Sequence, residues 1–388
     1  MSGHIRRRGK ESWELKFDIA RDEATGKRIT RYANIKGSRQ DAKFKLAELI
    51  ASVGRGSYVD RSPLTVAQHV AGRIEQWESL SKISPKTAER YRELLANQIV
   101  PHLGAKAVQK LKPADVEGWH ATLLTKGRKD GKGGISGRTV QHAHRLLSKA
   151  LKEGVRHEIV MRNVAATEQP PKVDNDEVVA LDNEQAKLVV TRLRGRAMYA
   201  KAITALFIGL RRGELLALRW NRIDLDSADK HLKIRETLEE TNAGLRFKAP
   251  KTKNSARDVS MPDIVVETLR EHRREQLKMR LALGLGKLSD DALVFPKLDG
   301  SPQSPRAFSK EWSDVAASIG LPEITFHALR HTHASHLIDA GIDVVKISRR
   351  LGHASPAITL KVYAHLFRRR DDKSSAAINA AVASLFSA

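Results

Sequence analysis

Hydrophobic and polar positions change their spacing twice along the chain, so that it divides into three stretches. In residues 13–20 (WELKFDIA) and 27–35 (KRITRYANI), apolar and polar side chains alternate, which predicts two strands joined by a turn through Gly26. Residues 38–53 then have helical spacing and begin with a serine, a favourable N-cap. The pattern therefore predicts a small β-sheet with one helix for residues 1–60.

Residues 65–168 have helical spacing almost throughout. Ser84 followed by Pro85 is typical of a helix start, and Pro113 and Ser136 open further helices by the same logic. A basic, glycine-rich loop, KGRKDGKGGISG, comes before the last of these helices. We expect a basic domain like a four-helix bundle, and its Lys/Arg face is compatible both with gripping a duplex and with simple solvation.

The second half begins after a segment that reads as a linker. Residues 169–180 (QPPKVDNDEVVA) combine a proline pair and several acids with few apolar side chains. Asp182, with Gln185 three residues on, has the pattern of a capping box and predicts a new helix. The apolar run AITALFIGL at 202–210 follows, and its composition predicts a buried segment.

Residues 231–261 resemble one small antiparallel sheet, made of HLKIRETL, LRFKA and RDVSM with turns at Asn242–Gly244 and Lys253–Ser255. The remaining residues read as helical to the end. The expected fold is thus multidomain and mainly α with small antiparallel β-sheets. Its expected parts are a β-sheet-plus-helix domain at 1–60, a helical domain at 65–168, the linker at 169–180, a mixed α/β domain at 181–370 and a tail helix at 371–388.

Composition adds a strong positive charge and the lack of cysteine. The 388 residues include 69 Lys and Arg against 45 Asp and Glu, a formal net charge of +24. A field of this sign attracts a polyanion, and nucleic acid is the usual one. Because the sequence contains no cysteine, disulfides, thiol catalysis and cysteine-based zinc sites are excluded.

Two features argue against secretion and against a membrane span. The N-terminus, MSGHIRRRGKESW, is basic but lacks the apolar core of a signal peptide. The longest apolar run, at 202–210, falls well short of the ~18 residues that a spanning helix needs. We expect no contact with a membrane and a cytosolic location, in a compartment that contains DNA.

Four stretches of the second half carry side chains suited to phosphate chemistry. Each holds a basic residue, a histidine or a tyrosine beside an apolar segment. They are GLRRGELLALRW with Arg211 and Glu214, the basic hairpin KAPKTKNSARDVSMP, HALRHTHASH with His327 and Arg330 on one helical face, and LGHASPAITLKVYAHL with His353 and Tyr363.

The arginines fit the charge of a DNA phosphodiester. Nucleophilic attack on phosphorus builds negative charge on the equatorial oxygens, and guanidinium groups match those oxygens bidentately without losing their own charge. Arg211 and Arg330 would therefore stabilise such a reaction without a metal ion. The alternative for Arg211 is a structural pairing with Glu214.

Tyr363 is the nucleophile that the pattern favours. Tyr32, Tyr58, Tyr91 and Tyr199 lack neighbouring phosphate-binding residues. A phenol with a pKa near 10 attacks poorly at neutral pH unless a base or a positive field assists it. A phosphotyrosine ester keeps the energy of the broken bond, so rejoining needs no ATP, and the sequence has no phosphate-binding G-x-x-x-x-G-K-[ST] loop.

These motifs, in this order and spacing, resemble those of tyrosine recombinases of the phage integrase family. The likeness covers roughly residues 180–370, whereas residues 1–165 resemble the arm-binding and core-binding domains of integrases in layout only. Arg212 and Gly213 stand where many relatives carry a hydrophobic residue and serine, which affects no catalytic position. The resemblance implies a site-specific recombinase that cleaves and rejoins DNA through a 3′-phosphotyrosine and integrates and excises a mobile element.

The resemblance also implies roles for the histidines and for a lysine. His327 would act as a base or bind the phosphate, and His353 would donate to a phosphate oxygen. A hairpin lysine would protonate the leaving 5′-oxygen; its place at the close of a strand favours Lys251, with Lys253 as the alternative. A zinc cluster of His331, His333 and His336 would lack carboxylate or cysteine ligands, so we expect these three to be core or supporting residues.

The implied partners are double-stranded DNA attachment sites, a homo-tetramer on that DNA, a DNA-bending host protein and an excision factor, with no cofactor and no metal.

The tail, 371–388, has an apolar stripe that either packs on its own domain or docks into a neighbouring protomer, as family tails do. Three alternatives remain: a resolvase of chromosome dimers, a type IB topoisomerase, and a catalytically idle DNA-binding protein with the same fold.

Overall fold

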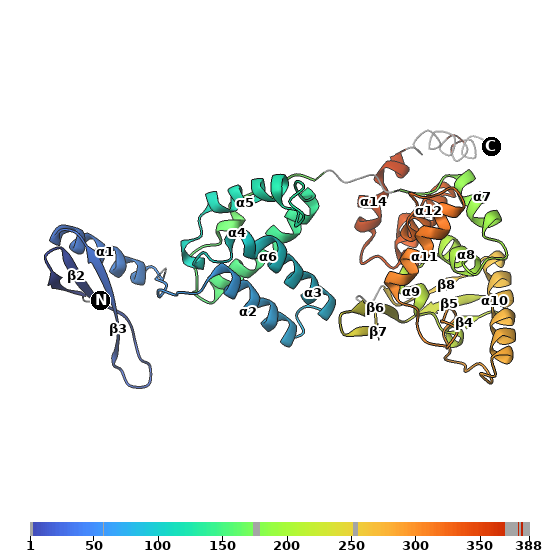
Figure 1. The fold of residues 1–388 in the computed structure, drawn as a ribbon, viewed down its shortest axis with the longest axis horizontal. Coiled ribbons are helices and arrows are strands. Elements are labelled where there is room, and N and C mark those ends of the chain that lie inside the picture. The colour runs from blue at the N-terminus through green and yellow to red at the C-terminus, as the bar shows by residue number, and fades with distance from the viewer. Residues whose placement is uncertain are drawn as a thin grey trace. The chain divides into compact units, whose positions relative to one another are not determined.

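The computed structural model describes residues 3–56, 58–173, 179–250 and 255–368, together with Asn379 and Val382 (Figure 1). The chain forms two compact units, 1–174 and 175–388. The boundary between them falls within residues 169–180, where the composition predicts a linker. The tail helix expected at 371–388 lies outside the described residues apart from these two positions.

The first unit begins with a three-stranded antiparallel sheet. Its strands are β1 (Gly3–Gly9), β2 (Ser12–Arg21) and β3 (Arg28–Lys36), in the order β1-β2-β3, and α1 (Arg39–Gly54) packs on one face. Leu15 and Phe17 of β2 are buried against Ala42 and Leu46 of α1. The prediction of two strands missed β1, because GHIRRRG has one apolar residue and joins the sheet through backbone pairing with β2.

The rest of the first unit is helical, as predicted. It contains α2 (Val66–Ser79), α3 (Pro85–Leu94), α4 (Val100–Leu103), α5 (Pro113–Lys126) and α6 (Gly137–Arg156), and a π-helical turn at Leu95–Ile99 joins α3 to α4. Ser84 and Ser136 cap α3 and α6, each accepting a hydrogen bond from the backbone N–H three residues on. Their apolar faces bury one core that includes Ile74, Trp77 and Leu147.

The second unit is built around α8 (Tyr199–Ile208), whose residues are buried on nearly every side because the sequence there is apolar all round. Helices α10 (Asp263–Ala282) and α12 (Phe326–Asp339) both pack against α8. The helices of this unit are α7 (Asn183–Arg192), α8 (Tyr199–Ile208), α9 (Arg212–Leu216), α10 (Asp263–Ala282), α11 (Pro305–Ser318), α12 (Phe326–Asp339), α13 (Val344–Leu351) and α14 (Pro356–Arg368) (Figure 1). Asp182 and Gln185 form the predicted capping box of α7.

The β-structure of this unit differs from the single sheet that was predicted. Strands β4 (Ile223–Asp224), β5 (His231–Ile234) and β8 (Arg257–Ser260) form one sheet, and β6 (Thr237–Thr241) with β7 (Gly244–Lys248) forms a separate hairpin. The segment HLKIRETL is divided after Ile234. Arg235 closes the first sheet there, because its guanidinium donates to the carbonyls of Ile234 and Arg257 and to the carboxylate of Asp258.

The prediction of continuous helix after residue 261 was also too simple, since residues 283–304 form a long connection between α10 and α11. Within the described residues, no helix has both the length and the apolar character needed to cross a bilayer. The fold is therefore multidomain and mainly α with small antiparallel sheets, as the sequence predicts.

Candidate active site

Two consecutive carbonyl groups at the end of α13 hold two of the predicted site residues. Arg330, on α12, donates from Nη2 to Leu351 O at 2.6 Å, and Arg211, before α9, donates from Nη2 to Gly352 O at 2.9 Å. Arg330 also donates from Nη1 to Gly209 O at 2.7 Å. Three segments that are far apart in the sequence are thus tied together at one place.

Gly352 is needed at this place for two reasons. It ends α13 in the left-handed conformation, with φ 67° and ψ 46°, which favours glycine. A Cβ at this position would lie 2.7 Å from Nη1 of Arg257. The tight turn therefore brings both carbonyls to the arginines and positions His353, the next residue, at the same site.

A buried carboxylate, Glu214, anchors the arginine cluster. Glu214 accepts hydrogen bonds from the backbone N–H of Arg211 at 2.9 Å and from its Nη1 at 2.7 Å. It also accepts from Nη1 and Nη2 of Arg257 at 3.1 and 2.9 Å. Arg211 therefore does pair with Glu214, yet 37% of the Arg211 side chain remains exposed to solvent.

Arg257 is a supporting residue that the sequence reasoning missed. Its side chain is 6% exposed, and its Nε donates to Arg350 O at 2.6 Å. It thus connects β8 to Glu214 and to the end of α13. The segment RDVS could have indicated this role. Its alternation places Arg257 at an inward position of the strand, where a charged residue requires a buried partner.

The charge on Glu214 should contribute to the stability of the second unit. Burial alone would raise the pKa of this carboxyl, but the hydrogen bonds and charges of Arg257 and Arg211 lower it to about 2. A depressed folded-state pKa gives stability that is fully present above the unfolded value near 4.5 and is lost as the pH falls toward 2.

We expect Glu214→Gln to destabilise this unit by about 3 kcal/mol at pH 7 and by less than half of that at pH 3, because at pH 3 the unfolded wild-type chain binds a proton at Glu214 that the folded chain does not. Hydrogen exchange of the α8 amides in increasing urea reports opening of this unit alone. If the free energy of opening differed between wild type and variant by the same amount at both pH values, the charge assigned to Glu214 would be contradicted.

Tyr363 lies at the same site and is held by a histidine. Its hydroxyl is 2.6 Å from Nδ1 of His331, and its ring is 1% exposed and packs against Ile347 and Leu351. The backbone at Tyr363, with φ −118° and ψ 15°, interrupts the helical geometry of α14. Burial raises the pKa of the phenol to about 12, although the charge of Arg330 acts in the opposite direction.

The two predicted catalytic histidines flank this arrangement. The ring of His327 meets that of His331 edge to face, with centroids 4.6 Å apart, and Nδ1 of His353 is 2.8 Å from the hydroxyl of Thr359. Burial, together with the charges of Arg330 and Arg211, lowers the pKa of both His327 and His353 to about 4. Both imidazoles are therefore neutral at pH 7 in the protein without DNA.

His333 is a core residue, as predicted. It is buried, it accepts a hydrogen bond from Nε of Arg350 at 3.0 Å, and burial lowers its pKa to about 3. In the part of the chain that the structure describes, no three or more His, Asp or Glu side chains are grouped so as to hold a metal ion. His331, by contrast, was expected only as a core or supporting residue, and it contacts the phenol directly.

The predicted general acid lies outside the described residues. Lys251 and Lys253 both fall in the gap between β7 and β8, and the chain is described again from Ser255. Ser255 is buried and its carbonyl accepts from Nη1 of Arg257 at 3.1 Å. The choice between the two lysines stays a prediction.

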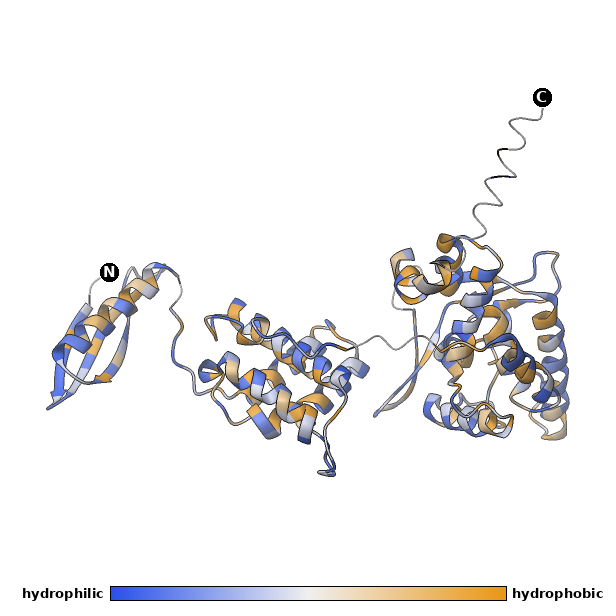
Figure 2. Cartoon of the chain, turned by 90° about the horizontal axis from the view of Figure 1, so that it is seen from above, coloured by the Kyte–Doolittle hydropathy of each residue, from blue (hydrophilic) through white to orange (hydrophobic). Residues whose placement is uncertain are grey.

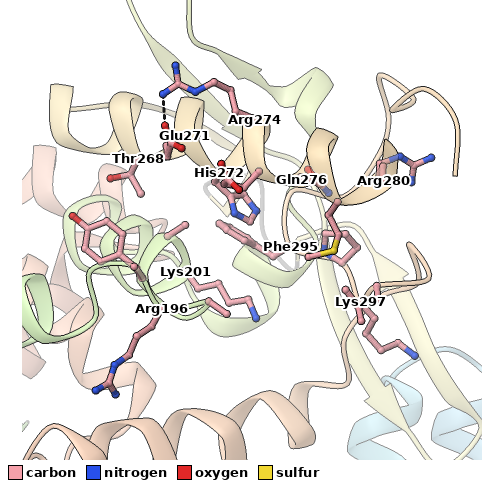
Figure 3. Close-up of a pocket in the computed structure, with 18 of the residues that line it drawn as sticks. Arg196, Lys201, Thr268, Glu271, His272, Arg274, Gln276, Arg280, Phe295 and Lys297 are labelled. Carbon is pink, nitrogen blue, oxygen red and sulfur yellow. Dashed lines mark hydrogen bonds and ion pairs between the residues drawn. The ribbon is translucent and has the colours of Figure 1, made fainter. Parts of the chain in front are cut away.

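A separate hollow of about 820 Å³ lies between the start of α8 and α10. Figure 3 shows Lys201, His272 and Phe295 facing it. His272 is held there by a hydrogen bond to Val294 O at 2.7 Å. Arg211, Arg330 and Tyr363 are not among the described residues that line this hollow, so it is distinct from the arginine–tyrosine site.

Comparison with known proteins identifies the family. Residues 172–370 match the phage integrase family. The chain belongs to the phage integrase family. Residues 74–124 also match the phage integrase N-terminal SAM-like domain. As a member of this family the chain is a tyrosine recombinase, a site-specific DNA recombinase of the kind that integrates mobile elements.

Relatives of the integrase cover most of its length. An integrase of Streptomyces ambofaciens is 30% identical over 88% of this chain and 86% of its own length. A XerC-like tyrosine recombinase of Caldanaerobacter subterraneus subsp. tengcongensis is 25% identical over 96% of both chains. Among solved structures, the integrase of transposon Tn1549 bound to transposon right end DNA has a TM-score of 0.68 at 20% identity, covering 81% of this chain and 100% of the other. That likeness supports the fold.

Proposed function

We propose that this integrase cleaves DNA by attack of Tyr363 on a backbone phosphorus, with Arg211 and Arg330 binding the phosphate. The observation that carries the proposal is the convergence of the two arginines on Leu351 O and Gly352 O, with the Tyr363 ring in the same buried cluster as Leu351. Guanidinium groups fixed in advance stabilise the charge that develops on the phosphate oxygens. The product is a 3′-phosphotyrosine, which a 5′-hydroxyl of a second strand attacks to rejoin the DNA.

The remaining side chains have proposed roles in proton transfer and phosphate binding. His327 and His353, both neutral before DNA binds, would hydrogen-bond the phosphate oxygens. Lys251, or Lys253 in its place, would protonate the leaving 5′-oxygen. The reaction draws on no nucleotide hydrolysis, since the ester keeps the energy of the broken bond.

Incubation of the full chain with nicked suicide DNA substrates tests this proposal. The nick lets the released fragment diffuse away, so cleavage is trapped as a covalent protein–DNA adduct on a denaturing gel. We expect adduct at the 3′-phosphate side of the cut. Tight DNA binding without adduct would favour the catalytically idle alternative, and relaxation of supercoils without strand exchange would favour a type IB topoisomerase.

The proposed partners are double-stranded attachment sites and three further copies of the chain. A solved λ integrase tetramer, bound to a Holliday junction, resembles this chain with a TM-score of 0.54 at 17% identity, and we propose a comparable assembly here. The tail at 371–388 would link the protomers. Four further points stay predictions: that the protein acts in a bacterial cytoplasm, that a host protein bends the DNA, that an excision factor takes part, and that excision is the reverse reaction.

The N-terminal sheet offers a second proposed DNA contact. The face that α1 leaves uncovered carries the exposed side chains of His4, Arg6, Lys16 and Tyr32, and strand pairing places His4, Lys16 and Tyr32 side by side. Lys16 Nζ lies 6.0 Å from the centre of the Tyr32 ring. In Figure 2 the strands of this part carry mostly hydrophilic residues, in blue. Such a face suits the DNA backbone and groove edges.

We expect the double substitution Arg6→Ala and Lys16→Ala to weaken binding of the full chain to arm-type DNA. Each lost phosphate contact should reduce the slope of log affinity against log salt by about 0.9. Lys43→Ala, a change of an exposed lysine on α1, is the matched control and should leave the slope unchanged. Equal losses in both variants would place the DNA elsewhere on this part of the chain.

A further inference from the structure

The phenol of Tyr363 has a hydrogen-bonding partner that the family motif does not assign. Nδ1 of His331 lies 2.6 Å from the Tyr363 hydroxyl, a short distance for such a pair. Both side chains are largely buried, and their ring centroids lie 5.8 Å apart. The backbone at Tyr363 is not helical, with φ −118° and ψ 15°, so α14 is interrupted at this residue.

His331 is also fixed relative to the phosphate-binding groups. It follows Arg330 directly on α12 and lies one turn after His327, whose ring it meets edge to face. The titratable and charged groups that face it are His327 and Arg330 on α12, His353 in the turn before α14, and Tyr363 on α14. A group in this position contacts the nucleophile and lies beside the proposed phosphate site.

We propose that His331 is a further catalytic residue, the base that takes the phenolic proton when Tyr363 attacks the DNA. This inference rests on the proposed function of Tyr363. In the tautomer that carries its own proton on Nε2, His331 accepts the Tyr363 O–H at Nδ1. The expectation drawn from the family resemblance gave this role to His327, but the hydrogen bond to the phenol is made by His331.

The charges around His331 explain why the proton stays on the phenol until DNA binds. Burial first, and then the neighbouring His327 and the charge of Arg330, lower the pKa of His331 to about 4, while burial raises the pKa of Tyr363 to about 12. A bound phosphate adds negative charge beside Arg330 and Arg211. It offsets the positive field that disfavours protonated His331, so proton transfer becomes easier when the substrate is in place.

The step balances without any further reagent. An electron pair of the Tyr363 oxygen forms the new P–O bond while the bond from phosphorus to the 5′-oxygen breaks. The phenolic proton passes to Nδ1 of His331, and the leaving 5′-oxygen takes a proton from the hairpin lysine. Rejoining reverses each transfer, so both groups return to their starting protonation states.

Single-turnover cleavage of nicked suicide DNA by the full-length His331→Ala variant tests this role. We expect cleavage about 10²-fold slower than wild type, as for loss of a general base, with DNA affinity within about twofold. Added imidazole should restore at least a tenth of the lost rate, and the rescue should grow with pH as imidazole loses its proton. Pyrazole, a ring of the same size but a much weaker base, should not rescue. His336→Ala, on the same helix, is the control and should cleave at the wild-type rate.

A substrate with sulfur in place of the leaving 5′-oxygen separates the base from the acid, because a thiolate leaves without a proton. His331→Ala should stay slow on this substrate. Wild-type or faster cleavage by His331→Ala, equal rescue by pyrazole, or a rate restored by the sulfur substrate would each overturn the role of His331. Failure of the wild type to form any adduct would instead overturn the proposed function.

Discussion

Tyr363→Phe is expected to abolish the covalent protein–DNA adduct while leaving DNA affinity unchanged. The substitution removes one oxygen, and the ring should keep its packing against Ile347 and Leu351. Without the phenol there is no group to form the phosphate ester, so cleavage should fall by at least about 10⁴-fold, as for the loss of a catalytic nucleophile. Suicide substrates on denaturing gels measure the adduct, and mobility shift on intact sites measures binding.

Tyr91→Phe is the matched control for this variant. Tyr91 is a partly buried tyrosine of the first unit, with its ring against Trp77, and its loss of a hydroxyl should leave adduct formation at the wild-type level. An adduct from Tyr363→Phe at a rate near that of the wild type would show that another side chain attacks the DNA. The interpretation of the whole site would then have to change.

Arg211→Lys is expected to slow cleavage by 10²- to 10³-fold at saturating DNA, with a smaller effect on affinity. Arg211 uses Nη1 for Glu214 and Nη2 for Gly352 O, and its exposed face is left to bind the phosphate. A lysine has a single point of charge and cannot make these contacts together. Removal of one fixed donor from a developing charge typically costs this much in rate.

Arg212→Lys is the control, since Arg212 is the neighbouring arginine and contacts Ser309 on α11. It should cleave at nearly the wild-type rate. If instead Arg211→Lys lost affinity in proportion to its rate, or Arg212→Lys lost as much activity as Arg211→Lys, the phosphate would not be bound by Arg211 in the way proposed.

The site could be predicted from the sequence to the extent that its residues belong to recognisable local patterns. Arg211, His327, Arg330, His353 and Tyr363 occur in motifs whose spacing is legible without coordinates, and the structure brings them together. Helix starts at Ser84, Ser136 and Asp182 were equally legible, because a cap is a local interaction.

Interactions between segments that lie far apart in the sequence could not be predicted from local patterns. Strand β1 has little apolar character and forms only because β2 offers backbone partners. Arg257 and His331 gain their roles from Glu214 and Tyr363, which lie 43 and 32 positions away. The division of the predicted sheet at Ile234 likewise depends on Arg235 reaching the neighbouring strand. No local spacing rule reports such contacts.

The most direct measurement of the central claim is a structure of Tyr363→Phe bound to an uncleaved attachment site. We expect the guanidiniums of Arg211 and Arg330 to lie about 2.7–2.9 Å from the non-bridging oxygens of one phosphate. We also expect the ring at position 363 to face that phosphorus on the side opposite the 5′-oxygen. Guanidiniums on two different phosphates, or a ring turned away from the phosphorus in every protomer, would contradict it.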